Sequence, residues 1–196
     1  QVFNMSSQVT YLSPGFILTL SDSRQRYHFS QLPGALRRVS PARLAIIDAL
    51  NKGFKGNLED LITTTAKQLN GSRAAILEFI NALRSAGYLT NTLPQLRYEA
   101  EPSGALAIAG DGELTIATPT SLVTQSGNYL WFDHEGRLLL RLTLPELLAA
   151  AMFSEPITIT LAKQLYLAQE RAEKIDAAEF DNLVSRMAGA GIFSPE

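Results

Sequence analysis

The sequence predicts an α+β protein made of two copies of one small module, each a small antiparallel sheet followed by three helices. The first observation behind this prediction is an internal repeat. Residues 83–90 (LRSAGYLT) match residues 187–194 (MAGAGIFS), with Gly87 and Gly191 in equivalent places at an offset of 104 residues. The second observation is that helix-start signals and helical apolar spacing recur in both halves of the chain.

The repeat also defines the expected domain organisation. The same offset places several further residues on one another: Pro41 on Pro145, Leu44 on Leu148, Leu61 on Leu165, Phe79 on Leu183, Ile80 on Val184 and Tyr27 on Trp131. We therefore predict a first module at residues 1–93 and a second at residues 105–196. Residues 94–104, which hold Pro94, Pro102 and Ser103, form the predicted junction.

Cap residues mark three helices in the first copy. Ser40 is a suitable N-cap and Pro41 a suitable first helical residue, because the first N–H groups of a helix have no intrahelical acceptor. Gly53 suits the end of this helix. The second and third helices are expected to begin at Asn57 and near Ser72, and the third carries Ile76, Phe79, Ile80 and Leu83 at helical spacing.

The second copy repeats these signals. Thr143 with Glu146, and Asp176 with Glu179, have the spacing of capping boxes. The middle helix is predicted over residues 158–170.

Short alternating or β-branched segments precede each set of helices and predict strands: residues 16–20, 26–29 and 36–39, then 114–117, 121–124, 129–132 and 138–142. Strands followed by three helices, the last ending in glycine and an apolar pair, predict two tandem winged-helix-like modules.

Composition restricts the function classes. Hydrophobic residues make up 46% and charged residues 18% of the 196 residues, as in a globular protein with a buried core. The formal net charge of -2 gives no overall positive field for nucleic acid. The chain has no cysteine, which excludes disulfides and thiolate chemistry and suits a reducing cytosol. No apolar run approaches the roughly 20 residues of a membrane span, so we expect a cytoplasmic protein without a membrane partner.

No catalytic centre is expected in this chain. Its two histidines, His28 and His134, and its scattered carboxylates do not supply the three or four ligands of a zinc site. The sequence motifs of phosphate-binding loops and nucleophile elbows do not occur, and residues 109–112 (AGDG) are a turn signal. Glu59 and Asp60 fall in the first turn of a predicted helix, where negative charge is stabilising. We therefore predict neither a metal nor a cofactor in this chain.

A basic cluster is the sharpest functional signal before any family is considered. Arg37 and Arg38 precede Arg43, and Arg73 opens the third predicted helix. On a winged-helix scaffold these residues could meet DNA phosphates. The third helix begins RAAILE, however, which offers few groups that read base edges. A solvated face is the plain interpretation, and anchoring of an acidic peptide is the alternative.

Four short segments resemble the N-terminal half of flavin-dependent azoline oxidases, which act in the biosynthesis of ribosomal peptides including cyanobactins. These are residues 12–18 (LSPGFIL), 39–42 (VSPA), 83–89 (LRSAGYL) and 188–193 (AGAGIF). The resemblance implies tandem peptide-recognition domains ahead of an FMN-binding, nitroreductase-like domain that oxidises thiazolines and oxazolines to azoles. The chain begins at Gln1 without an initiator methionine, and we expect it to be a piece of a longer protein. FMN would belong to the oxidase domain, in the same or a companion chain.

The resemblance also implies a peptide site. In such domains a leader peptide adds as a strand to the sheet edge and packs its apolar side chains against the third helix. For the first copy this implies an acceptor edge at residues 36–39, a groove on the third helix, and arginines for acidic leader residues. The candidate residues are Leu36, Arg37, Arg38, Val39, Arg73, Ile76, Leu77, Ile80 and Arg84. Ile76 and Ile80 are equally suited to the core, and the equivalent edge of the second copy is residues 138–142.

Two alternatives stay open from the sequence. The modules could be a structural or dimerising half of the same enzyme that binds no peptide. The chain could also be an independent winged-helix regulator that binds DNA.

Overall fold

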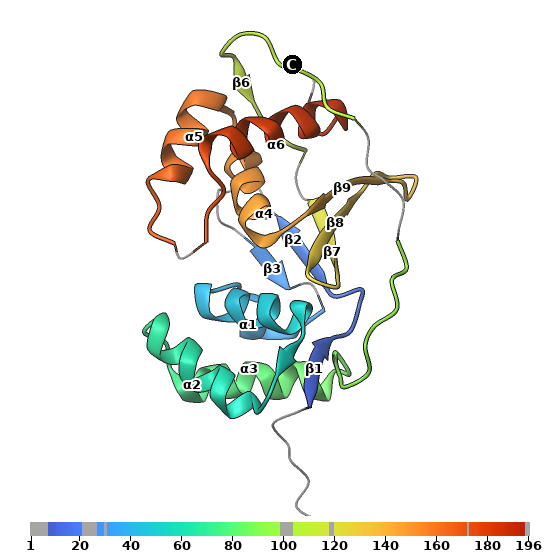
Figure 1. Cartoon of the computed structure of the whole chain (residues 1–196), viewed down its shortest axis with the longest axis vertical. Helices are drawn as coiled ribbons and strands as arrows, with labels where there is room; N and C mark the ends of the chain where they lie inside the picture. The colour runs from blue at the N-terminus through green and yellow to red at the C-terminus, as the bar shows by residue number, and fades with distance from the viewer. Residues whose placement is uncertain are drawn as a thin grey trace, which may run out of the picture. The chain divides into compact units, whose positions relative to one another are not determined.

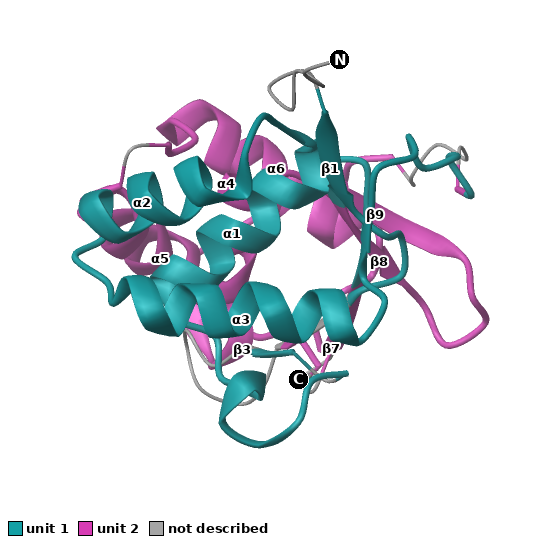
Figure 2. Ribbon diagram, turned by 90° about the horizontal axis from the view of Figure 1, so that it is seen from below, with its two compact units in different colours: residues 1–18, 28–97, 123–128 teal, residues 19–27, 98–122, 129–196 magenta. Residues whose placement is uncertain are grey.

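A computed structural model of the chain describes residues 8–20, 27–29, 31–98, 104–117, 120–171 and 173–194. The chain divides into two compact units, coloured separately in Figure 2. Unit 1 comprises Gln1–Leu18, His28–Arg97 and Val123–Asn128, and unit 2 comprises Thr19–Tyr27, Tyr98–Leu122 and Tyr129–Glu196. Residues 19–27 therefore interrupt unit 1 in sequence but belong to unit 2, and residues 123–128 interrupt unit 2 but belong to unit 1. The junction expected at residues 94–104 stays a prediction.

Unit 1 combines three helices with a small sheet (Figure 1). Its elements are β1 (Val9–Leu12), α1 (Pro41–Lys52), β4 (Phe54–Lys55), α2 (Leu58–Gln68), α3 (Arg73–Ser85) and β5 (Leu89–Thr90). The sheet has the antiparallel order β4-β1-β5, in which Thr10 is opposite Phe54 and Leu12 is opposite Leu89. The first strand of the unit therefore completes a sheet with two strands that follow it by more than forty residues.

Unit 2 contains a corresponding set of elements. They are β6 (Glu113–Leu114), α4 (Leu144–Ala150), the 3-10 helix η3 (Ala151–Ser154), β10 (Ile157–Thr158), α5 (Ile159–Leu167) and α6 (Ala177–Gly189). β6 pairs antiparallel with β10, and Ile116 forms an isolated bridge with Phe193. This bridge lies 104 residues after the pairing of Leu12 with Leu89 in unit 1. The order helix, short strand, helix, helix, closing strand pair thus occurs in both units, and the expected mixture of helices and small antiparallel sheets is confirmed.

The remaining strands form a five-stranded sheet in the order β3-β2-β7-β8-β9. They are β2 (Ile17–Leu20), β3 (Tyr27–Phe29), β7 (Thr120–Gln125), β8 (Asn128–Phe132) and β9 (Leu138–Leu142). β9 has the bounds predicted from the sequence. The predicted strands 16–20, 121–124 and 129–132 differ from β2, β7 and β8 by one residue at one or both ends. Arg26 of the predicted strand 26–29 lies outside the described residues. The predicted strand 114–117 overlaps β6 at Leu114 alone.

The predicted helix starts are confirmed by their caps. Ser40 Oγ accepts a hydrogen bond from the Arg43 N–H, with Pro41 in the first turn. Asn57 and Ser72 cap α2 and α3 in the same way. In unit 2, caps stand at Thr143, Thr158 and Asp176, of which Thr143 forms the full reciprocal capping box with Glu146. Side-chain caps of this kind satisfy N–H groups that no helical carbonyl can reach.

The strand predicted at residues 36–39 is wrong. Gly34–Arg37 form a 3-10 helix, η2, and only Arg38 makes an isolated bridge, to His28. Pro33 has no N–H to give to a strand partner, and Gly34 takes a left-handed φ of 53° that turns the chain. The Arg43 guanidinium then binds the carbonyls of Ala35 and Arg38 at 2.9 and 2.8 Å. The carbonyl groups that a strand would direct at a neighbour are therefore satisfied by an arginine.

Four short strands, β1, β4, β5 and β10, were not predicted. Apart from β1, each has only two residues, which is too short for a period-2 pattern to be recognised. β1 has the alternating burial of a half-buried strand, with Thr10 and Leu12 on its buried side. Its partners lie far along the chain, so the sequence gives no local signal for the pairing.

Aromatic clusters occupy the core of each unit. In unit 1 the rings of Phe16 and Phe29 lie 5.5 Å apart, and those of Phe29 and Phe79 lie 5.4 Å apart. In unit 2 the ring of Phe180 lies 5.7 Å from Tyr166 and 6.2 Å from Phe153. Rings at these separations attract one another beyond the area that they bury. Each unit therefore has a hydrophobic core of its own.

The turn between β8 and β9 is held by Asp133, which makes its stability depend on pH. Its carboxylate accepts hydrogen bonds from the N–H groups of Arg137 and Glu135 at 2.8 and 2.9 Å. The Arg137 N–H hydrogen bond, more than any other contact, lowers the pKa of Asp133. A lowered folded-state pKa adds stability above the unfolded value of about 3.9, and this stability is lost as pH falls through the folded value.

We expect acid to loosen this turn before the rest of unit 2. The amide signals of Glu135 and Arg137 in nuclear magnetic resonance spectra should move together as the pH is lowered from 5 toward about 2. In the Asp133→Asn variant this coupled shift should vanish, since an amide oxygen accepts the same bonds without titrating. If the shift persists in that variant, another group is responsible.

Among the helices that the structure describes, none is long and apolar enough to cross a membrane.

Candidate functional site

The nine residues predicted to bind peptide are not brought together in one groove. Leu36 within η2 and Val39 after it are half-buried, whereas Arg37 and Arg38 are exposed. Because residues 36–39 are not a strand, they do not form the predicted acceptor edge. Whether any of these side chains contacts a peptide stays a prediction.

The predicted residues on α3 separate into core and surface. Ile76 and Ile80 are 3% and 1% exposed and belong to the core of unit 1, whereas Leu77 is 40% exposed. Buried side chains of this kind cannot contact a peptide unless the core opens. Arg73 forms an exposed ion pair with Glu59. Neither isoleucine therefore lines a groove, and Arg73 is engaged within its own unit.

Arg84 is the predicted residue that the structure places in a pocket. The pocket has a volume of ≈ 380 Å³ and lies within unit 1. β1 and β5 form one wall, the start of α2 a second, and the last turn of α3, with Arg84, a third. Among the described residues, the Arg84 side chain has neither an ion pair nor a hydrogen bond. This volume is in the range of small-ligand sites.

Several polar residues of the pocket were missed by the sequence. Thr10 contributes from β1, Thr90 and Asn91 from β5 and the residue after it, and Asn57 from the α2 cap. They come from distant segments of the chain, and no spacing rule connects them. Asn57 was recognised only as a cap, which it is: its Oδ1 accepts from the Glu59 N–H at 3.0 Å. The signal that could have singled out Thr10 is its polarity on the buried side of a strand.

A second candidate site is the edge strand β9. It ends the order of the five-stranded sheet, and in the described part of the chain its strand partner is β8 alone. Leu138, Leu140 and Leu142 are buried, and the residues between them are half-buried. The edge of such a strand carries main-chain donors and acceptors that can pair with another strand. Trp131, the single tryptophan of the chain, lies opposite Leu140.

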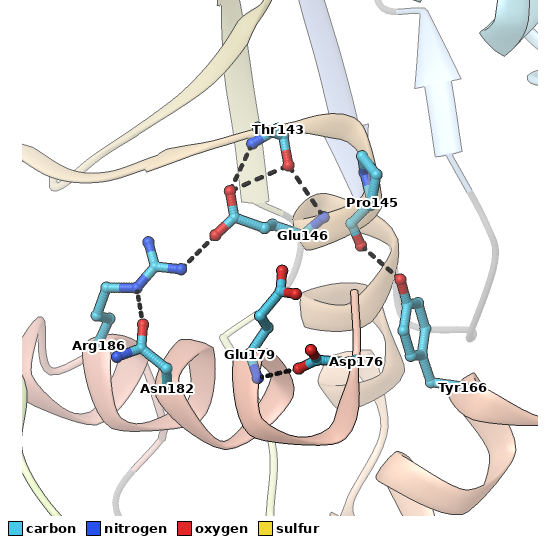
Figure 3. A network of polar contacts seen from close by, with 8 residues as sticks. All are labelled: Thr143, Pro145, Glu146, Tyr166, Asp176, Glu179, Asn182 and Arg186. Atoms are coloured by element: carbon cyan, nitrogen blue, oxygen red, sulfur yellow. Dashed lines mark hydrogen bonds and ion pairs between the residues drawn. The ribbon is translucent and has the colours of Figure 1, made fainter. Parts of the chain in front are cut away.

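The polar network of unit 2 is structural (Figure 3). Glu146 accepts from the N–H and the hydroxyl of Thr143, each at 3.0 Å, and forms an ion pair with Arg186 of α6. The Tyr166 hydroxyl donates to the Pro145 carbonyl at 3.2 Å and accepts from the Ile175 N–H at 3.0 Å. Burial raises the pKa of Tyr166 above its usual value. These groups tie α4, α5 and α6 together.

The described residues were also compared with what a metal site and acid–base catalysis require. They contain no group of three or more histidine and carboxylate side chains that could hold a metal ion. His28 is half-buried in β3, and His134 is exposed in the β8–β9 turn. The two features that could serve recognition are therefore the pocket of unit 1 and the β9 edge of unit 2.

Comparison of the chain with protein-family models, with curated proteins and with solved structures finds no match.

Proposed function

We propose that the chain is a peptide-recognition region built of two tandem winged-helix-like modules. It would serve an FMN-dependent oxidase that converts thiazolines and oxazolines to azoles in ribosomal peptides. The observation that carries the proposal is the edge strand β9, which has alternating buried leucines and ends the order of its sheet. An extended peptide can add to such an edge through main-chain hydrogen bonds, and side-chain pockets then give specificity.

The order of elements in each unit supports the proposed fold. A helix, a short strand, two helices and a closing strand pair are the arrangement of a helix-turn-helix core with a small sheet. In the second copy, β9 is the strand that directly precedes this core. In the first copy the equivalent residues, 34–38, contain η2 instead. The proposed acceptor edge therefore lies in the second copy and no longer at Leu36 to Val39.

The pocket of unit 1 does not suit FMN. The pocket of unit 1 has a volume of ≈ 380 Å³, has no aromatic side chain in its lining, and contains a single cationic side chain. A flavin ring with its phosphate does not fit this set of groups. We therefore assign the cofactor to the oxidase domain that the family resemblance implies, in the same or a companion chain.

The test is titration of the chain with the leader peptide of a precursor encoded beside its gene. We expect a dissociation constant below about 100 μM by calorimetry, since strand addition with side-chain anchoring commonly reaches micromolar affinity. Trp131 fluorescence should change at the same peptide concentration, because this residue lies across from Leu140 of the proposed edge. Binding without any change at Trp131 would contradict the β9 assignment.

Proline substitutions test whether the leader peptide pairs with the β9 edge. Neighbouring residues of a regular antiparallel strand direct their N–H groups to opposite sides. The pairing of β9 with β8 is regular from Leu140 to Leu142, so one of Leu140→Pro and Arg141→Pro removes a donor that points away from β8. The variant that keeps the native melting temperature should weaken leader binding at least about tenfold. Val39→Pro is the matched control, because Arg38 already has the extended backbone that precedes proline, with φ -69° and ψ 128°.

The control also tests the first-copy site. If Val39→Pro weakens binding and the β9 variant does not, the acceptor edge lies at residues 36–39 after a rearrangement of η2. If both variants bind as the native chain does, strand addition is the wrong mode.

A structural or dimerising role is the second candidate. Leu161 and Leu165, one turn apart on α5, are 44% and 39% exposed, and a pair of exposed leucines favours a protein contact. Failure of the leader peptide to bind at about 100 μM, together with a dimer in analytical ultracentrifugation, would favour this role. Binding of duplex DNA that weakens with salt would instead favour a winged-helix regulator.

A further inference from the structure

The pocket of unit 1 contains a threonine whose hydroxyl makes no hydrogen bond with the described part of the chain. Thr10 is 9% exposed and lies on the buried side of β1 with Leu12. Its side chain lines the pocket, and no hydrogen bond to it is found among the described residues. A valine would fill the same space in a strand without a polar group to desolvate. A hydroxyl left in this position is therefore suited to a ligand in the pocket.

Hydrogen-bond donors surround this hydroxyl. The Leu58 N–H is the first of α2 and has no intrahelical acceptor. The Asn57 side chain uses its oxygen in the cap, which leaves its amide N–H groups to face the pocket. Thr90 accepts from the Thr92 N–H through its hydroxyl oxygen, so its own proton can be donated. These donors come from β1, α2 and β5, of which β1 and α2 are labelled in Figure 1.

The charges around the pocket favour an anionic ligand. Arg84 is the one charged residue among those that line the pocket. α2 begins at the pocket, and its eleven residues direct a partial positive charge there. The acidic residues of its first turn, Glu59 and Asp60, do not line the pocket, and Glu59 is paired with Arg73. The pocket therefore presents several donors and one positive charge.

We propose that this pocket binds the carboxylate group of an acidic ligand, with Arg84 as the cation and Thr10, Asn57 and the start of α2 as hydrogen-bond donors. A single cation matches a singly charged carboxylate better than a doubly charged phosphate. The volume of ≈ 380 Å³ admits a group of the size of one or two amino-acid residues. The carboxylate can come from a free small acid or from an acidic side chain of a peptide.

This site is independent of strand addition at β9, because it lies wholly within unit 1. The family resemblance implied that Arg84 meets acidic leader residues beside an acceptor edge at residues 36–39, whereas the present proposal places its carboxylate partner in the pocket of unit 1. Failure of the leader peptide to bind β9 would leave the carboxylate site standing, and the reverse also holds.

The test uses nuclear magnetic resonance spectra of the nitrogen-15-labelled chain. The probes are N-acetyl-glutamate N-methylamide, its glutamine analogue, glutarate and inorganic phosphate. The glutamate probe should shift the amide signals of Gly56, Leu58 and Thr90 and saturate with a dissociation constant of about 5 mM. The glutamine analogue has the same shape without the charge and should bind at least about fivefold more weakly.

Two variants test the named groups. Arg84→Gln should weaken binding of the glutamate probe about tenfold, and Thr10→Val about threefold. Arg37→Gln is the matched control, because Arg37 is an exposed arginine of the same unit that does not line the pocket. Thr10→Val should keep the native melting temperature, since valine has the shape of threonine, suits a strand, and removes no hydrogen bond within the described part of the chain. A loss of affinity in this variant then reports on the ligand and not on folding.

The probes also identify the source of the carboxylate. Binding of glutarate but not of the blocked glutamate indicates a free acid, and binding of both admits a peptide side chain. The proposal is overturned if phosphate binds more tightly than the carboxylates, or if the glutamine analogue binds as well as glutamate. It is equally overturned if no signal around the pocket moves at about 50 mM probe, or if Arg84→Gln binds as the native chain does.

Discussion

Replacing Phe79 with alanine should destabilise the chain by about 3–5 kcal/mol. Phe79 is 0% exposed, and its ring lies 5.4 Å from that of Phe29 in the core of unit 1. The Arg43 guanidinium lies 5.4 Å above the same ring, and such a contact adds about 0.5–1 kcal/mol. Truncation removes the ring contacts and leaves a cavity that close-packed neighbours fill only in part. Thermal unfolding followed by circular dichroism should show a melting temperature lowered by about 10 °C.

Leu77→Ala is the matched control for this change. Leu77 stands on the same helix but is 40% exposed, so its truncation should cost less than about 1 kcal/mol. A large loss at Leu77 together with a small loss at Phe79 would mean that α3 presents its other face to the core. The comparison also bears on function. Leu77 was predicted to bind peptide, and its truncation can change affinity without changing the fold.

Replacing Glu146 with alanine should destabilise unit 2 by about 2 kcal/mol. Its carboxylate accepts two hydrogen bonds from Thr143 at 3.0 Å and pairs with Arg186 on α6. The variant keeps the Thr143 cap but removes the reciprocal half of the capping box, a loss of up to about 1 kcal/mol. Loss of the partner also leaves the Arg186 guanidinium, 29% exposed, without its carboxylate. Urea unfolding should detect the difference, and hydrogen exchange should show faster exchange at the start of α4.

Asp181→Asn is the matched control for the loss of an ion pair. Asp181 pairs with Lys163 at 2.8 Å, but its side chain is 57% exposed. Water and salt screen such a pair, and its loss should cost less than about 1 kcal/mol. Equal losses at Glu146 and Asp181 would contradict the view that Glu146 acts as a structural link between two helices. The native pH dependence of the β8–β9 turn should be unaltered by either variant.

The two proposed binding sites lie in different units of the chain. Strand addition uses main-chain groups of β9 in unit 2, whereas the carboxylate pocket uses side chains of unit 1. The Arg84→Gln variant alters unit 1, and the β9 proline variants alter unit 2. Each of these should therefore affect one kind of ligand and leave the other unchanged, whereas the Val39→Pro control should affect neither.

Prediction from the sequence succeeded where the signal is local. Ser40, Asn57, Ser72 and Thr143 each have the side chain that a helix start requires, and all four cap a helix. It failed at residues 36–39, a short segment that ends in the β-branched Val39 and was predicted to be a strand. Pro33 and Gly34 redirect the backbone there, and Arg43 takes the carbonyl groups. A pattern of side chains cannot report that main-chain acceptors are already occupied.

The sequence by itself determined the α+β class, the helix starts and the offset of 104 residues at which strand pairings recur, because caps and periodicity act over a few residues. Only the tertiary structure decided that β1 closes a sheet with β4 and β5. The same pairing places the Thr10 hydroxyl beside Arg84 and the start of α2. These groups are separated by tens of residues, and only the packing of strands and helices determines which of them share a pocket.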